Sequence, residues 1–82
     1  MLIVTQKGEV LNLSHIGRMW IQATNNGSFQ IKADFFRWLD GLVMAEYKTR
    51  SFAESEMERL VRTYDDERKK FEFSFEWIQR GE

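Results

Sequence analysis

The stretch "RMWIQATNNGSFQIKADFF", residues 18–36, decides the fold, because two alternating runs of apolar and polar residues flank an Asn-Asn-Gly segment at 25–27. Asn and Gly accept positive φ angles and so close tight turns between antiparallel strands. The pattern therefore predicts a hairpin with strands at about 17–24 and 28–36.

The two faces of this hairpin differ in polarity, since side chains alternate between the faces of a strand. We expect the apolar face to point to the core: Met19, Ile21, Ala23, Phe29, Ile31, Ala33 and Phe35. The opposite face carries Trp20, Gln22, Thr24, Gln30, Lys32 and Asp34.

Upstream of the hairpin, "LIVTQ" is a short apolar run rich in β-branched residues, which predicts a strand at about 2–6. "KGE" follows it as a turn. "EVLNLSHIG" has weak periodicity and indicates a short, irregular extended segment that leads into the hairpin.

Downstream, "FRWLDGLVMAEYKT" repeats the strand pattern. Asp40 and Gly41 predict a second turn, and residues 42–48 predict another strand, in which Val43, Ala45 and Tyr47 alternate with polar or flexible neighbours. These strands predict an antiparallel meander.

A helix is expected after the meander, because the period changes in "SFAESEMERLVRTY". Its apolar stripe consists of Ala53, Met57, Leu60, Val61 and Tyr64. Ser51, with Glu54 three positions on, predicts a capping box at the first turn. The helix is expected to run from Ser51 to about Glu67.

The tail "KKFEFSFEWIQ", residues 69–79, fits two structures. Aromatic residues alternate with polar ones, as in a strand, yet spacings of three and four also fit a continuation of the helix. A helix over 52–78 would be about 40 Å long at ~1.5 Å per residue, too long for a small sheet to cover. We therefore favour a closing strand at about 70–77.

Together these elements predict one α+β domain, residues 1–82. It would contain an antiparallel sheet of four or five strands packed against one helix at about 51–67, completed by the C-terminal strand.

Composition narrows the functions to be considered. Twelve basic and thirteen acidic residues give a net charge of −1, so no overall field gathers nucleic acid or anionic lipid. The chain has no cysteine, which excludes disulfides and thiol chemistry and fits a reducing compartment. No apolar run approaches a membrane span, and we expect a cytoplasmic protein with no membrane association.

No enzymatic chemistry is predicted. The single histidine, His15, adjoins Ser14, but neighbouring side chains point apart in an extended segment. Carboxylates such as Asp34, Asp65 and Asp66 have no ligand-spaced histidine pair, and the five glycines form no phosphate-binding loop. We therefore expect no catalytic residue, no metal and no cofactor.

Contacts with other macromolecules are the remaining class of function. Trp and Arg are frequent among interface hot spots, so Trp20, Phe36, Arg37 and Trp38 form a candidate protein-binding patch. One alternative is structural: Trp20 and Phe36 share the outer face of the hairpin and cover each other, or the helix covers that face. The other is a nucleic-acid-binding surface made of Trp20, Trp38 and nearby Lys and Arg residues.

The aromatic tail suggests self-association. Phe71, Phe73, Phe75 and Trp77 would share one face of the closing strand, and that face is too apolar to be left in water. Either the chain's own helix covers this face or a second copy does, and in both cases we expect the chain to be able to form a homodimer.

The segments "IVTQKGEVLNLSHIGRMWIQ", "SFQIKAD" and "LVMAEYKTRSFAESEMERLV" resemble a group of small, mostly uncharacterised proteins of Gram-positive bacteria and their phages. The likeness covers most of the chain. It implies a sheet covered by one helix and an origin in a phage or mobile element, and it implies no activity.

Overall fold

The computed structural model describes residues 1–35, 39–63 and 70–75 of the chain. Its elements are β1 (Leu2–Val4), β2 (Val10–Asn12), a 3-10 turn (Leu13–His15), β3 (Ile16–Ala23), β4 (Phe29–Phe35), β5 (Leu39–Tyr47), α1 (Arg50–Thr63) and β6 (Lys70–Glu72).

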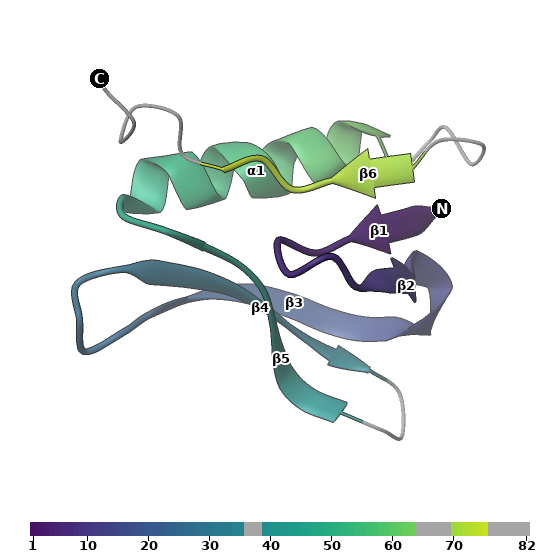
Figure 1. The fold of residues 1–82 in the computed structure, drawn as a ribbon, viewed down its shortest axis with the longest axis horizontal. Coiled ribbons are helices and arrows are strands. Elements are labelled where there is room, and N and C mark those ends of the chain that lie inside the picture. Colours follow the sequence, from purple (N-terminus) through teal and green to yellow (C-terminus); the bar gives the residue numbers. More distant parts are fainter. Residues whose placement is uncertain (36–38, 64–69, 76–82) are drawn as a thin grey trace.

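The strands form two sheets of three rather than one meander of four or five, although the α+β class is confirmed. The large sheet has the order β3-β4-β5 and is antiparallel throughout. The small sheet has the order β2-β1-β6, with β2 antiparallel and β6 parallel to β1. In Figure 1, α1 and the small sheet lie together on one side of the large sheet.

The hairpin of β3 and β4 forms as predicted. Ile21 lies opposite Ile31, and the N–H of Thr24 donates to the carbonyl oxygen of Ser28 at 2.9 Å. Gly27 closes the turn with a φ of 85°, which L side chains rarely adopt. On the predicted core face, the β4 residues after Phe29 are buried, whereas Ala23 is exposed near the turn.

The predicted turn at Asp40 and Gly41 is wrong. Both residues belong to β5, which begins at Leu39, and Gly41 has a φ of 68° at an irregularity in the pairing with β4. The N–H of Gly41 donates to Oδ1 of Asp34 at 2.7 Å. A positive φ serves a bulge as well as a turn, so the Asp-Gly pair has the right conformation but a different role.

A second bulge reverses the predicted alternation in β5. Ile31 lies opposite Ala45 but Lys32 lies opposite Val43, so Met44 is the additional residue. Met44 is buried in the core. Val43, which strict alternation would place on the same face as Ala45 and Tyr47, lies beside Lys32 on the other face. The carbonyl oxygen of Met44 accepts from the N–H of Gln6 at 3.0 Å, which joins the two sheets.

Helix α1 starts one residue before the predicted position and has a different cap. The N–H of Phe52 donates to Oγ1 of Thr49 at 3.2 Å, so Thr49 rather than Ser51 caps the first turn. The buried face consists of Ala53, Glu56 and Leu60. Val61, predicted to belong to the core stripe, is 68 % exposed. The predicted last residues, 64–67, lie outside the described part of the chain.

The tail forms a closing strand, but a shorter one than predicted. Strand β6 ends at Glu72, and it pairs in parallel with β1 so that Phe71 lies opposite Ile3. Residues 76 and 77 of the predicted strand lie outside the described residues.

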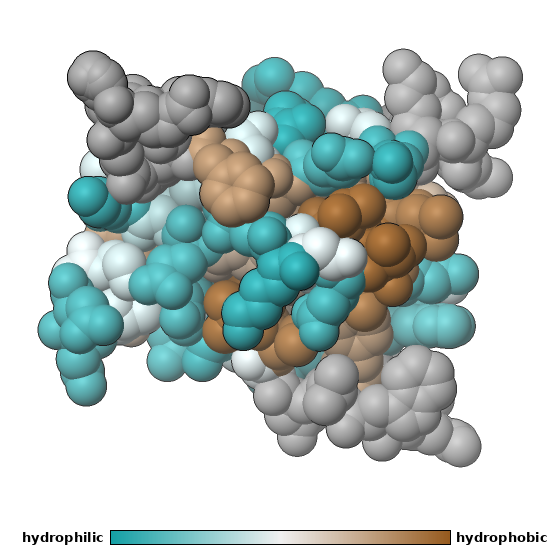
Figure 2. All heavy atoms as spheres, viewed as in Figure 1, coloured by the Kyte–Doolittle hydropathy of each residue, from teal (hydrophilic) through white to brown (hydrophobic). Residues whose placement is uncertain are grey.

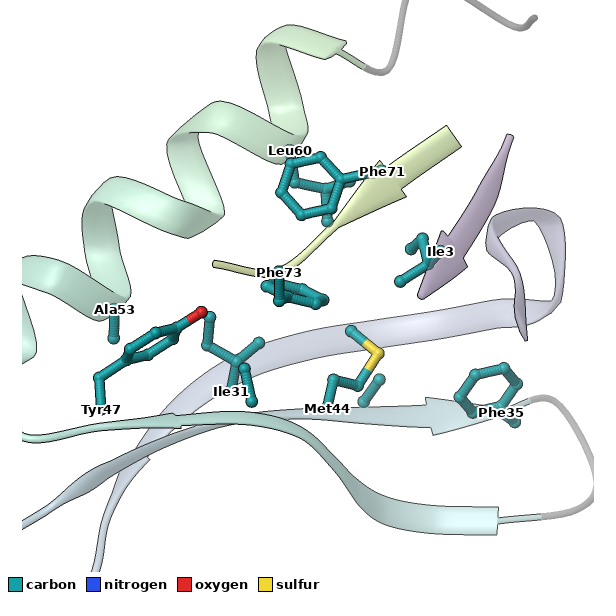
Figure 3. Packing of buried hydrophobic residues seen from close by; sticks show 11 residues of the cluster. Ile3, Ile31, Phe35, Met44, Tyr47, Ala53, Leu60, Phe71 and Phe73 are labelled. Atoms are coloured by element: carbon teal, nitrogen blue, oxygen red, sulfur yellow. The ribbon is translucent and has the colours of Figure 1, made fainter. Parts of the chain in front are cut away.

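The core is filled from both sheets and from α1. Phe71 and Phe73 are both buried, and their rings meet edge to face with centroids 5.0 Å apart. Figure 3 shows them between Leu60 of α1 and residues of the large sheet such as Ile31 and Met44. The chain's own helix and large sheet thus cover these two aromatic rings.

Candidate partner-binding surface

The face of the large sheet that points away from α1 and the small sheet is called here the outer face. Its residues occupy alternate positions of the three strands. In the pairing register, Arg18 lies opposite Asp34, Trp20 opposite Lys32, and Gln22 opposite Gln30, which in turn lies opposite Glu46.

Trp20 is held in place by its neighbours on this face. The guanidinium carbon of Arg18 lies 4.6 Å from the centroid of the indole ring, within the range of a cation–π contact. The indole Nε1–H donates to Oε1 of Gln22 at 3.2 Å. Since both contacts come from the same strand, the half-buried ring has a defined position on a rigid element.

Arg18 is in turn fixed by Asp34 on β4. Its Nε and Nη2 atoms lie 3.1 and 2.8 Å from Oδ2 of Asp34. The backbone N–H of Gly41 has the largest influence on the pKa of Asp34 and lowers it; burial opposes this, and the hydrogen bond and charge of Arg18 lower it further. Asp34 therefore stays ionised at neutral pH and balances the charge of Arg18.

Glu46 supplies a second negative charge near the turn end of the outer face. Its carboxylate accepts from the hydroxyl of Ser28 and from Nε2 of Gln30, the latter at 3.3 Å. These two hydrogen bonds outweigh burial and lower the pKa of Glu46. Together with Asp34, this carboxylate leaves the face with mixed charge.

The structure locates one of the four residues of the predicted protein-binding patch. Trp20 lies on the outer face, as the alternation predicts, whereas Phe36, Arg37 and Trp38 lie outside the described residues. Arg18, which orders Trp20, was not among the predicted site residues. The signal that could have found it is its spacing of two from Trp20, which places both side chains on one face of a strand.

The residues predicted for self-association also differ in their exposure to solvent. Phe71 and Phe73 are buried within the chain, Phe75 is 57 % exposed, and Trp77 lies outside the described residues. Figure 2 shows a further hydrophobic area over β1 and β2, where Leu2 and Val10 are exposed.

An ion pair between a buried carboxylate and a partly exposed arginine, which the sequence did not indicate, joins α1 to the tail. The charged side chain of Glu56 is buried. Its Oε1 accepts from Nη2 of Arg59 at 2.8 Å and from the N–H of Ser74 at 2.9 Å. Arg59 also lies over the ring of Phe71, 4.2 Å from its centroid. These contacts satisfy the carboxylate and indicate a structural role.

Within the described ranges, the remaining polar groups form no constellation typical of catalysis. His15 lies on the exposed 3-10 turn, and the hydroxyl of Ser14 donates to Oδ1 of Asn12 at 2.8 Å. In the part of the chain that the structure describes, no three His, Asp or Glu side chains gather where they could hold a metal ion. None of the helices described there is long and apolar enough to cross a membrane.

Comparison with known proteins adds no family. The chain matches no protein-family model, and neither a curated protein nor a solved structure is significantly similar to it.

Proposed function

We propose that this chain is a small non-enzymatic interaction module that binds another protein through the outer face of the large sheet, with Trp20 at the centre of the contact. The observation that supports this proposal is the indole ring of Trp20 held between Arg18 and Gln22 on a regular strand.

An ordered, half-buried aromatic ring suits protein recognition. Trp and Arg are enriched among the residues that contribute most to protein interfaces. A ring whose position is already fixed loses less conformational entropy on binding than a free side chain does. The contacts of Trp20 therefore favour binding at this point of the surface.

The charges of the outer face favour a protein over a nucleic acid. Arg18 is paired with Asp34 at 2.8 Å, and Glu46 adds a second carboxylate. A nucleic-acid-binding sheet needs an excess of cations to neutralise phosphates, in addition to aromatic rings for stacking. Here the carboxylates oppose the approach of a phosphate backbone.

The class of partner follows from the resemblance noted above. A phage or mobile-element accessory protein acts on its host, so a protein of the bacterial host is the proposed target. This part of the proposal rests on the quoted sequence segments alone.

Affinity capture from a lysate of the host bacterium, with the purified chain as bait, tests the proposal. Trp20→Ala should lose at least one protein that the unmodified chain retains reproducibly. Phe75→Ala removes an exposed aromatic ring from the other layer of the molecule and should retain it. Arg37→Ala and Trp38→Ala test two further residues of the predicted patch.

The result that contradicts the proposal is an identical set of captured proteins for Trp20→Ala and the unmodified chain. A gel shift with labelled single-stranded and double-stranded oligonucleotides tests the alternative. Nucleic-acid binding should weaken steeply with salt, and we expect no shift at any salt concentration.

A further inference from the structure

The β3 strand forms one edge of the large sheet. It has eight residues and pairs with β4 on one side. Within residues 1–35, 39–63 and 70–75, no strand pairs with its other side. An edge of this length is a template for a further strand, because its outward backbone groups need hydrogen-bond partners.

The register identifies the outward groups. Thr24 bonds to Ser28 across the hairpin, and hydrogen-bonded pairs recur at every second residue of an antiparallel ladder. Trp20 and Gln22 therefore direct their N–H and C=O groups to β4. Met19, Ile21 and Ala23 direct theirs away from the sheet, and their side chains lie on the face that carries α1.

An apolar hollow adjoins the same edge. It has a volume of about 200 Å³ and is lined by Leu13, Met19, Leu60 and Val61. A cavity of roughly 150 Å³ with apolar walls accepts a molecule of the size of benzene, so the hollow has room for an apolar side chain. Val61, which continues the apolar stripe of α1 but is 68 % exposed, lies at this hollow.

The usual protections against edge pairing are absent from β3. Its sequence, IGRMWIQA, has no lysine and no proline, and its one charged residue, Arg18, is paired with Asp34 on the outer face. The irregularity in its pairing with β4 lies near its start, between Ile16 and Arg18, and leaves Met19 to Ala23 regular.

We propose that a second copy of this chain occupies the edge, so that two β3 strands pair antiparallel and the two large sheets form one six-stranded sheet. A two-fold axis near Ile21 places Met19 of each copy opposite Ala23 of the other, and Trp20 opposite Gln22. The added strand covers the hollow of each protomer and shields Val61 from water.

Charge and polarity favour a second copy over an unrelated strand. On the face that carries α1, the apolar side chains of Met19, Ile21 and Ala23 from the two copies meet across the two-fold axis. On the outer face, Gln22 of each copy meets the indole of Trp20 of the other. No like charges are brought together, since Arg18 lies opposite Thr24 of the second copy. An interface that uses one surface twice must be self-complementary in this way.

The test is the molar mass measured by light scattering over a wide range of protein concentration. The unmodified chain should approach twice its monomer mass of 9.9 kDa as concentration rises. Ala23→Lys should return the mass to that of the monomer, because it places an ammonium group against Met19 of the other copy. Ala23 is exposed, so its replacement should leave the circular dichroism spectrum and the melting temperature unchanged.

Val10→Lys is the matched control, since it places the same side chain on the exposed edge strand of the small sheet and should leave the dimer intact. Amide hydrogen exchange gives a second readout without mutation. Protection of Met19, Ile21 and Ala23 should increase at least tenfold between dilute and concentrated protein. A monomer at every concentration, or a dimer that persists in Ala23→Lys with these three amides unprotected, would overturn the proposal.

A loss of dimerisation in Ala23→Lys with unchanged capture of the host protein would separate this inference from the proposed partner binding. Capture that depends on Trp20 in a chain that stays monomeric would support the proposed function and refute the dimer.

Discussion

Glu56 and Arg59, one turn apart on α1, both hydrogen-bond to the backbone of the segment at residues 72–74. Oε1 of Glu56 accepts from the N–H of Ser74 at 2.9 Å, and Nη2 of Arg59 donates to the carbonyl oxygen of Glu72 at 2.7 Å. The two side chains are bonded to each other at 2.8 Å. Helix side chains thus satisfy backbone groups that a neighbouring strand would otherwise bond.

Replacing Glu56 by alanine should destabilise the fold by about 2–3 kcal/mol. Breaking a buried ion pair typically costs about 3–5 kcal/mol, and the loss is smaller here because the Arg59 side chain is 44 % exposed and can be rehydrated. Urea denaturation measures the change. Glu58→Ala removes an exposed pair with Arg62 and should change the free energy of unfolding by less than about 1 kcal/mol. Equal effects of the two variants would contradict the role given to Glu56.

Stability should fall as the solution is acidified. Burial raises the pKa of Glu56, but the hydrogen bonds from Arg59 and Ser74 outweigh it, so the pKa is lower in the folded state than in the unfolded state. The unfolded chain then binds more protons, and the stabilisation is complete above the ordinary glutamate pKa of about 4.3. It is lost as pH falls through the folded-state pKa.

Urea midpoints at pH 7 and pH 3 test this pH dependence. Asp34 and Glu46 contribute in the same direction, because their pKa values are also lowered. Glu56→Gln should therefore reduce the difference between the two midpoints without abolishing it. A variant with an undiminished difference would exclude Glu56 as a source of the acid sensitivity.

Gly41→Ala should destabilise the protein by about 1–2 kcal/mol, since a side chain at a φ of 68° is strained whatever space surrounds it. Gly17→Ala is the matched control in β3, the strand at the opposite edge of the large sheet. Its φ is ordinary, and an added Cβ would meet the carbonyl oxygen of Asp34 at 3.8 Å, which is a normal contact. Thermal unfolding of both variants tests whether Gly41 forms a bulge within β5.

The bulge at Met44 makes a prediction opposite to that of simple alternation. Met44→Ala should cost about 2–5 kcal/mol, because Met44 is almost fully buried and its truncation leaves a cavity. Val43→Ala should cost less, about 1 kcal/mol, since this side chain lies beside Lys32 on the outer face. The reverse order of these two losses would show that β5 has the uninterrupted register.

Local signals predicted much of the fold. The β3–β4 hairpin depends on a turn of three residues and on alternation within each strand, and both can be recognised over short distances. The helix was also predicted, although Thr49 and Ser51 are both good caps and only the structure distinguishes them.

Long-range contacts explain the errors. Met44 is the additional residue of a bulge whose carbonyl bonds to Gln6, a contact that alternation within β5 cannot reveal. The pairing of β6 with β1 is likewise fixed by distant packing. A glutamate within a helix is expected to face solvent. Glu56 is buried instead because Arg59 and the backbone N–H of Ser74 bond to its carboxylate, and these contacts depend on tertiary structure.

The candidate site was predictable to a similar degree. Alternation placed Trp20 on the outer face because the side-chain period of a strand is two. The contact of Arg18 with the indole ring depends on Asp34, which lies on the next strand, so it required the cross-strand register.

The parallel pairing of β1 with β6 has a consequence for folding kinetics. Gln6 and Ser74, which bond at 2.8 Å, are separated by 68 positions in sequence. The hairpin and α1 depend on local contacts and can form while a ribosome is still making the chain. Ile3 can be covered by Phe71 only after residue 71 has been synthesised. Closing such a long loop slows folding, so the N-terminal strand should be the last to gain protection in a refolding experiment.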